Sequence, residues 1–263
     1  MAKAILYDAT QCVGCLECEK ACAAENNLPY DDTIAAEKLT SAHKYTYVAV
    51  KADDKYMRKL CMHCQDPTCV SACPVGALEK TNSGAVTYDE SKCMGCRYCM
   101  LACPFGVPKY EWTKVLPGVR KCILCSDRIS IGQPTACAEA CPTGATIVGE
   151  RDVMLAEAHK RLQENRDAYI QHIYGEKEAG GTSVLMLSSI PFAEFGLPKL
   201  GDQPLPHLTA DIIEHIPDVA TVGLALLGGI WWITNRRDLV AVEDRQSCLS
   251  GQARLPVPHE EKE

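Results

Sequence analysis

Aromatic side chains are scarce in this chain of 263 residues. Phe, Tyr and Trp together make up 6% of the sequence, and only three residues are Phe. Aromatic side chains normally contribute a large part of the area buried in a protein core. The apolar area that this chain can bury in a core is therefore small for a protein of this size. Another source of order is expected.

An excess of positive charge is also lacking. The chain has 27 Lys and Arg against 34 Asp and Glu, a net charge of −7, and it shows no basic stripe. Phosphate contacts require clustered basic side chains, so no nucleic-acid partner is expected. The sequence also shows no nucleophile–base pair, phosphate loop or dinucleotide fingerprint. We therefore expect no catalytic residue, and we do not expect the chain to be an enzyme by itself.

The sequence begins without a recognisable leader. Its first residues contain no apolar stretch and no twin arginine. We therefore expect no secretory leader, which argues against a disulfide scaffold of the secreted type.

Cysteine, in contrast, is abundant, with 17 residues, of which 16 fall into four quartets. Within each quartet most neighbouring cysteines are three to five residues apart, too close together for disulfides that close long loops. Only Cys248 is left over, and we expect it to be a free thiol. In order, quartets one to four are Cys12-x2-Cys15-x2-Cys18-x3-Cys22, Cys61-x2-Cys64-x4-Cys69-x3-Cys73-Pro74, Cys93-x2-Cys96-x2-Cys99-x3-Cys103-Pro104, and Cys122-x2-Cys125-x11-Cys137-x3-Cys141-Pro142.

The spacing of these cysteines is typical of [4Fe–4S] sites. The run C-x2-C-x2-C-x3-C-P belongs to bacterial ferredoxins, whose fourth cysteine ligates the other cluster of a pair. Three thiolates at positions i, i+3 and i+6 of a loop can bind three corners of one cube-shaped [4Fe–4S] cluster. The fourth thiolate lies on a helix that leads away, so it reaches the neighbouring cluster. Gly14 and Gly95 would permit the tight loops. Zinc is the alternative metal, but a zinc site gives no reason for this triplet-plus-one pattern.

The same rule predicts how the quartets pair. Quartets two and three are separated by 19 residues, between Cys73 and Cys93, so they should form one ferredoxin-like unit. Quartets one and four would form the other. The predicted ligand sets of the four clusters are Cys12, Cys15, Cys18 and Cys141 (set one); Cys61, Cys64, Cys69 and Cys103 (set two); Cys93, Cys96, Cys99 and Cys73 (set three); and Cys122, Cys125, Cys137 and Cys22 (set four).

The remaining patterns predict an α+β fold made of two ferredoxin-like dicluster units with small hairpin insertions, and a C-terminal transmembrane helix. The predicted divisions are 1–150 for the clusters, 151–218 for a helix, a strand pair and an extended docking arm, 219–235 for the span, and 236–263 for a cytoplasmic tail. We expect strands at 45–50, 85–88, 145–148, 169–174 and 183–187, a helix at 152–165, and an extended arm at 191–218.

The predicted span, 219–235, is 17 residues long and carries no formal charge. It ends in Trp231 and Trp232, which favour the headgroup boundary, followed by Arg236 and Arg237. More basic residues follow the span than precede it, so the positive-inside rule places the cluster domain on the periplasmic side of the cytoplasmic membrane. The domain would then cross the membrane with a partner that carries a twin-arginine leader. The alternative is a helix packed within the protein or on a partner.

Three segments add a resemblance to these motifs: residues 61–67 (CMHCQDP), 103–108 (CPFGVP) and 174–183 (YGEKEAGGTS). With the four quartets in this order, the chain resembles the iron–sulfur subunit family of DMSO reductase, membrane formate dehydrogenases and hydrogenase-2. It is most similar to the beta-subunit branch of the last two. Some members carry a [3Fe–4S] cluster where quartet three lacks a cysteine, but quartet three is complete here, so four [4Fe–4S] clusters are expected.

The resemblance implies an electron-transfer subunit in anaerobic respiration. It would link a large catalytic subunit, either a formate dehydrogenase with a molybdenum or tungsten pterin or a [NiFe] hydrogenase, to an integral-membrane quinone-reactive subunit within the lipid. The pair of quartets two and three would lie nearer the membrane. A soluble polyferredoxin-like carrier is the alternative. His63, inside quartet two, is expected to pack or to act beyond the ligands. Lys92, Arg97, Lys109, Arg120 and Lys121 would either moderate cluster charge or be ordinary solvated residues.

Overall fold

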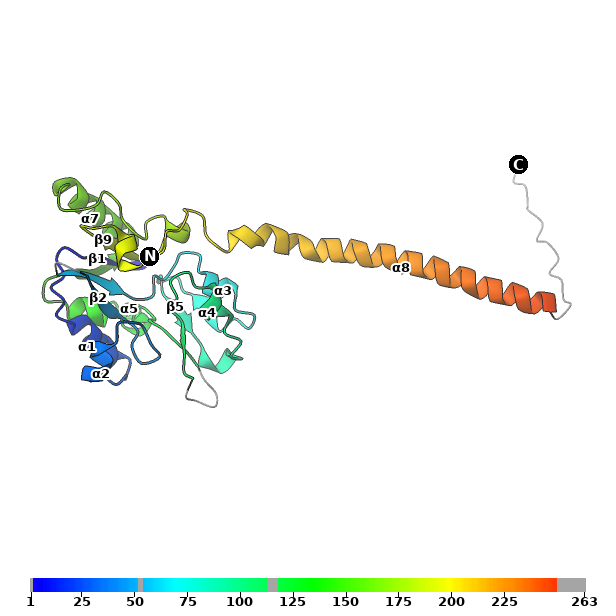
Figure 1. Cartoon of the computed structure of the whole chain (residues 1–263), viewed down its shortest axis with the longest axis horizontal. Helices are drawn as coiled ribbons and strands as arrows, with labels where there is room; N and C mark the ends of the chain where they lie inside the picture. Colours follow the sequence, from blue (N-terminus) through cyan, green and yellow to red (C-terminus); the bar gives the residue numbers. More distant parts are fainter. Residues whose placement is uncertain (1, 52–53, 113–117, 250–263) are drawn as a thin grey trace. The chain divides into compact units, whose positions relative to one another are not determined.

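The computed structural model describes residues 2–51, 54–112 and 118–249 (Figure 1). The end of the predicted tail, 250–263, lies outside the described residues. The chain divides into two units, Met1–Leu208 and Thr209–Glu263, and each is considered separately.

A three-stranded sheet forms the centre of the first unit. Its order is β8 (Thr146–Glu150), β1 (Lys3–Asp8) and β9 (Val184–Leu187), with β1 antiparallel to β8 and parallel to β9. Residues 4–8 of β1 are all buried, because this middle strand is covered on both faces. Such a strand shows a continuous apolar run instead of alternation, and no strand was expected there.

Each face of the sheet packs against a different part of the chain. On one face lies α7 (Arg151–Glu164), which agrees with the predicted helix and buries Met154, Ala158 and Leu162 (Figure 1). On the other face, Ile5 and Tyr7 join a core cluster that also contains cysteines of quartets one, two and four. The sheet is thus the surface on which three of the four cysteine loops rest.

Three antiparallel hairpins extend from this core: β2 (Tyr47–Lys51) with β3 (Lys55–Lys59), β4 (Leu78–Lys80) with β5 (Val86–Tyr88), and β6 (Lys109–Tyr110) with β7 (Val119–Arg120). The second confirms the hairpin predicted around residues 81–88. Its turn includes Gly84 at φ +93°, where an added Cβ would lie 2.6 Å from the carbonyl oxygen of Lys3. A glycine is therefore required at this close approach.

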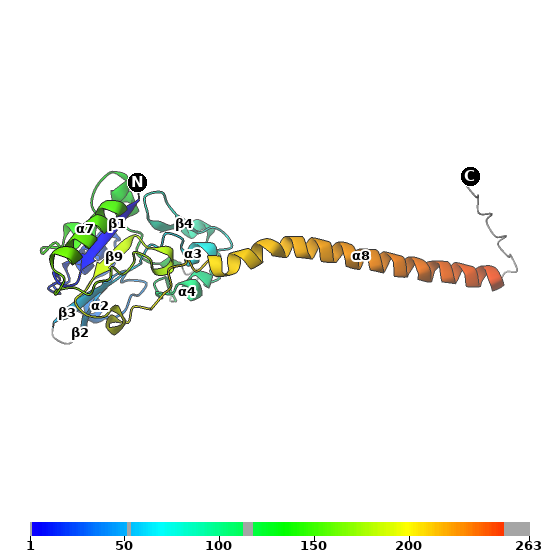
Figure 2. The ribbon, with the colours of Figure 1, turned by 90° about the horizontal axis from the view of Figure 1, so that it is seen from above.

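Short helices follow the cysteine loops: α1 (Glu17–Glu25), α3 (Thr68–Ser71), α4 (Tyr98–Ala102), α5 (Ser126–Ser130) and α6 (Ala136–Glu139). The others are α2 (Asp32–Ala36) and the 3₁₀ turns η1 (Glu90–Lys92), η2 (Glu178–Gly180) and η3 (Phe192–Phe195). Helix α1, from quartet one, contacts α6, from quartet four. Helices α3 and α4, from quartets two and three, also contact each other (Figure 2).

The strand predicted at 169–174 is wrong. Only Tyr174 forms a bridge, to Met186 of β9. The amide N–H of His172 donates to the carbonyl oxygen of Ile170 at 2.7 Å, two residues back. This local turn interrupts the pairing between the bond from Ile170 to Ser188 and the bridge from Tyr174 to Met186. The predicted strand pair is therefore reduced to β9 and one bridging residue.

The second unit is built around α8 (His207–Leu249), a helix of 43 residues. It begins well before the predicted span 219–235, so residues 207–218 are helical instead of extended, with Pro217 inside the helix. The large apolar side chains between Val219 and Ile233 are more than half exposed. By length and composition α8 is able to cross a membrane, and it is the one helix of this kind among the described residues.

Candidate iron–sulfur centre

All 17 cysteines are free thiols in the structure. Cysteines of all four quartets line two core regions of the first unit. Cysteines of quartets one, two and four contact the main core cluster, whereas cysteines of quartets two and three contact a smaller cluster around Leu78, Val86 and Tyr110. Soft thiolates are the ligands that iron–sulfur clusters use, so the donor set suits that cofactor.

The four CxxC loops share one backbone feature. The residue before the second cysteine has a positive φ in every quartet: Gly14 at 68°, His63 at 49°, Gly95 at 75° and Leu124 at 59°. This conformation turns successive amide N–H groups inward and forms a concave surface suited to an anion. A Cβ at Gly14 would lie 2.3 Å from the Tyr56 ring, so the expected role of this glycine in a tight loop fits the structure.

The Cys-Pro turns supply further donors to the last cysteine of three quartets. For Cys73, the amide N–H of Ala77 donates to the sulfur at 3.2 Å. Burial acts to raise the pKa of Cys73 and of Cys141, but backbone N–H donors outweigh it and both pKa values are lowered. For Cys103, burial dominates and raises the pKa. Lowered pKa values favour the thiolate, the form that ligates iron.

Quartet one has no proline after its last cysteine, and the structure shows which donor replaces the Cys-Pro turn. With Ala23 after Cys22, helix α1 continues to Glu25 instead of turning. The side-chain amide of Asn26 then donates to the Cys22 sulfur at 3.7 Å. A side-chain donor one helical turn later thus takes the place of the backbone donors of the Cys-Pro turn.

Electrostatic coupling shows which thiols the fold brings together. Burial raises the pKa of Cys22, and the charges of Cys122, Cys137 and Cys125 raise it further. For Cys64, burial is again the main cause, followed by Cys61, Cys103 and Cys69. For Cys99, burial and then Cys93, Cys73 and Cys96 raise the pKa to about 11. These three groups have the same members as sets four, two and three.

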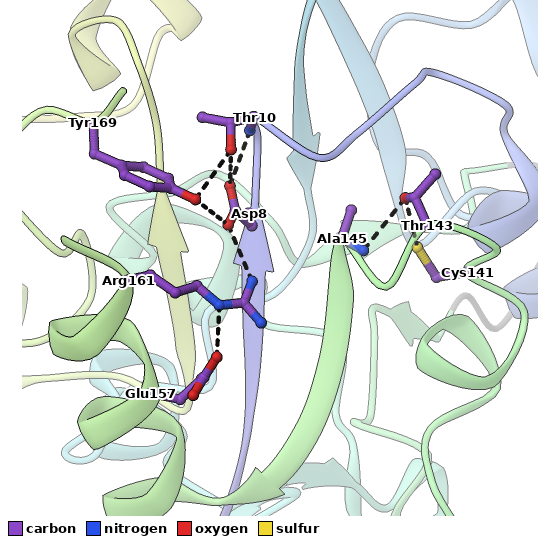
Figure 3. A network of polar contacts seen from close by, with 8 residues as sticks. All are labelled: Asp8, Thr10, Cys141, Thr143, Ala145, Glu157, Arg161 and Tyr169. Atoms are coloured by element: carbon purple, nitrogen blue, oxygen red, sulfur yellow. Dashed lines mark hydrogen bonds and ion pairs between the residues drawn. The ribbon is translucent and has the colours of Figure 1, made fainter. Parts of the chain in front are cut away.

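The first set is tied together differently, through Asp8 at the end of β1 (Figure 3). The amide N–H of Asp8 donates to the carbonyl oxygen of Ala145 at 2.7 Å, in the turn after Cys141. Its carboxylate accepts from the amide and hydroxyl of Thr10, at 3.0 and 2.6 Å, just before Cys12. Asp8 therefore holds the loops of Cys12 and Cys141 next to each other.

The Asp8 carboxylate is fully buried, and a fixed set of partners compensates its charge. Arg161 of α7 donates to Oδ2 at 3.0 Å, and the Tyr169 hydroxyl donates to the same oxygen at 2.8 Å (Figure 3). Glu157 holds the same guanidinium at 2.8 Å. Loss of the Asp8 charge would leave Arg161 paired with Glu157 but would remove the charge-assisted hydrogen bonds to a fully buried carboxylate, and hydrogen bonds to charged groups contribute about 1.5–3 kcal/mol.

We accordingly expect Asp8→Asn to weaken the first unit. A loss of about 1.5–3 kcal/mol corresponds to a fall of about 3–12 °C in the midpoint of thermal bleaching of the visible absorbance. The exposed Asp167→Asn is the matched control and should leave that midpoint unchanged. An Asp8→Asn protein with an unchanged midpoint would show that this network does not hold the loops.

The four sets also follow one another in space. Cys18 of set one interacts with Cys137 of set four, Cys122 of set four with Cys61 of set two, and Cys69 of set two with Cys99 of set three. Exposure follows the same order, because the two exposed cysteines of the quartets, Cys15 and Cys96, belong to sets one and three at the two ends.

One buried polar atom tests whether a cofactor fits here. The His63 ring is 1% exposed, and its Nδ1 accepts from the amide N–H of Val86 at 2.8 Å. Nε2 then carries the proton, yet it has no partner among the described residues. A buried donor without an acceptor is costly, and a sulfur of a cluster held by the flanking Cys61 and Cys64 would provide one. No described group of three or more His, Cys, Asp or Glu side chains is arranged to hold a single metal ion.

Buried and half-buried cations near the cysteine loops were largely missed by reasoning from the sequence. Of the five basic residues that flank the cysteine motifs, only Lys121 is buried. Its ammonium donates to the carbonyl oxygens of Val86 and Cys122. Arg58 and Lys80 lie outside the motifs. Burial lowers the pKa of Lys80 to about 8, while Cys64 and Cys61 act to raise it. Nothing in the spacing of the quartets marks these two residues, because they come from hairpins between the motifs.

Comparison with known proteins agrees with this geometry. Residues 52–151 match the 4Fe-4S dicluster domain family. A protein of Nitratidesulfovibrio vulgaris is 40% identical over 93% of this chain and 70% of its own length. The hydrogenase-2 operon protein HybA of Escherichia coli O157:H7 is 36% identical over 88% and 84%. The nitrate-inducible formate dehydrogenase iron-sulfur subunit of E. coli K12 is 34% identical over 74% and 71%.

The fold and the cysteine loops thus define an iron–sulfur electron-transfer subunit with a ferredoxin-like [4Fe–4S] domain, which is not itself a catalytic subunit. The chain belongs to the family of iron–sulfur subunits that includes HybA and the formate dehydrogenase iron-sulfur subunits.

Proposed function

We propose that this chain relays electrons through four [4Fe–4S] clusters, from a large catalytic subunit to an integral-membrane quinone-reactive subunit. The catalytic partner would be a formate dehydrogenase with a molybdenum or tungsten pterin, or a [NiFe] hydrogenase. One observation supports the proposal: α1, which carries Cys22, contacts α6, which carries Cys137, and the charges of Cys122, Cys137 and Cys125 act to raise the pKa of Cys22. An exchange of last cysteines between paired quartets is the arrangement of a two-cluster ferredoxin.

In this proposal the chain's own residues bind the clusters and set their surroundings. Each bound cluster supplies one-electron oxidation and reduction. The four ligand sets proposed from the sequence hold them, inward N–H groups donate to the sulfurs, and the core excludes water. The exposed thiols Cys15 and Cys96 support electron entry and exit at sets one and three.

We further propose that α8 anchors the complex in the cytoplasmic membrane, with the cluster domain on the periplasmic side. The apolar run ends at Trp231 and Trp232, and the Arg236 guanidinium lies 5.7 Å from the centre of the Trp232 ring, a pairing suited to the headgroup boundary. Within this scheme 1–150 carries the clusters, 151–218 contacts partners, 219–235 spans the membrane, and the residues from 236 on are cytoplasmic. Protease added to intact spheroplasts should cleave the cluster domain, and full protection would place it in the cytoplasm.

Elemental analysis of the complex, purified anaerobically through this chain, tests the function. We expect about 16 iron atoms per chain beyond those of the catalytic partner. Nickel would identify a hydrogenase, and molybdenum or tungsten a formate dehydrogenase. Zinc in place of iron would overturn the proposal.

A further inference from the structure

Arg58, on β3, is a buried cation without a carboxylate partner. Its side chain is 1% exposed, and it is the largest of the fully buried side chains. Nε donates to Thr46 Oγ1 at 3.0 Å, and Nη1 lies 3.5 Å from Thr146 Oγ1. These hydroxyls orient the guanidinium but bring no negative charge. Among the described residues, no carboxylate forms an ion pair with it.

Two acidic side chains buried in this part of the first unit already have their own cations, since Asp8 pairs with Arg161 and Glu19 pairs with Lys44. Glu19 of α1 pairs with Lys44 at 2.8 Å, and both side chains are at most 3% exposed. Glu19 also accepts from the amide N–H of Val48 at 2.7 Å and from the Tyr30 hydroxyl at 3.1 Å. Its charge is therefore compensated without Arg58.

A guanidinium does not deprotonate in proteins, so Arg58 remains charged where it is buried. Burial alone acts to lower its pKa, but the charges of Cys137, Cys18 and Cys22 outweigh burial and raise the pKa. These thiolates are the counter-charges that a buried cation requires. They also belong to two different sets, because Cys18 is in set one whereas Cys22 and Cys137 are in set four.

We propose that Arg58 is the shared counter-ion of the clusters held by sets one and four, and that its fixed charge raises the reduction potentials of both. This inference rests on the proposed cluster ligation. Reduction adds negative charge to a cluster, and a positive charge nearby stabilises the reduced form. We expect a smaller effect on sets two and three, because the charges that act most strongly on Arg58 come from sets one and four.

The experiment is a redox titration of the whole complex, monitored by electron paramagnetic resonance, with iron measured per chain. Arg58→Met removes the charge, Arg58→Lys keeps it, and the exposed Arg166→Met is the matched control. In Arg58→Met, we expect two of the four signals to show at least a tenfold lower ratio of reduced to oxidised cluster at a fixed potential. That change equals a fall of 59 mV for a one-electron couple. Arg58→Lys should shift the same two signals less.

Three results would overturn the inference: no shift in Arg58→Met with iron unchanged, an equal shift of all four signals, or an equal shift in Arg58→Lys and Arg58→Met. If Arg58→Met is recovered with less iron, Arg58→Gln replaces it, because Gln keeps a hydrogen-bond donor without the charge. Failure of the proposed function would be seen separately, as missing iron or missing signals in the unmodified complex.

Discussion

Cys22→Ser is expected to remove the cluster whose other ligands lie about a hundred residues further along the chain, at Cys122, Cys125 and Cys137. Serine is a poor replacement for a soft thiolate ligand. The iron attributable to this chain should fall by about a quarter, and one paramagnetic signal should disappear. The physical reason is the contact of α1 with α6, which places Cys22 beside quartet four instead of completing its own loop.

Comparing which paramagnetic signal each variant loses shows which cysteines bind the same cluster. Cys22→Ser and Cys125→Ser should remove the same signal, whereas Cys15→Ser and Cys141→Ser should remove a second, different one. Cys248→Ser is the matched control, because Cys248 is exposed on α8 outside every quartet. If Cys22→Ser and Cys15→Ser removed the same signal, each quartet would bind its own cluster and the proposed exchange would be wrong.

Two charges in the apolar part of α8 are expected to release the chain from lipid. Leu226 and Ile230 are 63% and 59% exposed, so neither has a place in a packed core. An arginine near the centre of a span costs about 2.5–3.5 kcal/mol, so Leu226→Arg with Ile230→Arg costs about 5–7 kcal/mol of insertion free energy. After a carbonate wash, this double variant should move from the membrane pellet to the supernatant.

Leu208→Arg is the control, because Leu208 belongs to the same helix but lies outside the apolar run. It should remain in the pellet. A double variant that also stayed in the pellet after the wash would mean that contacts with other subunits hold the chain, and that α8 is a docking helix.

The cysteine spacing indicates where the cysteine loops lie, and the structure shows one shared backbone conformation in all four of them. Thiolate positions follow from local loop geometry, and local geometry is encoded within a few residues, as at Gly14 and Gly95. The buried Arg58 and the half-buried Lys80 were not predicted, because their positions depend on hairpins that fold over loops distant in sequence. The strand β1 was also missed, although β9, which is likewise buried and without alternation, was predicted at 183–187. The limits of α8 were too narrow because hydropathy locates the apolar run, whereas helical hydrogen bonding continues into polar residues.

The sheet order β8-β1-β9 has a consequence for biosynthesis. Strand β1 is made first, yet its two neighbours are β8 and β9, so its edges remain unpaired until Leu187 has left the ribosome. Cys12, Cys15 and Cys18 likewise wait for Cys141, while quartets two and three are complete at Cys103. Domains tend to fold in the order in which they are made. The unit of quartets two and three can therefore fold during translation. The beginning of the chain must be protected from aggregation and from oxygen until most of the protein has been made.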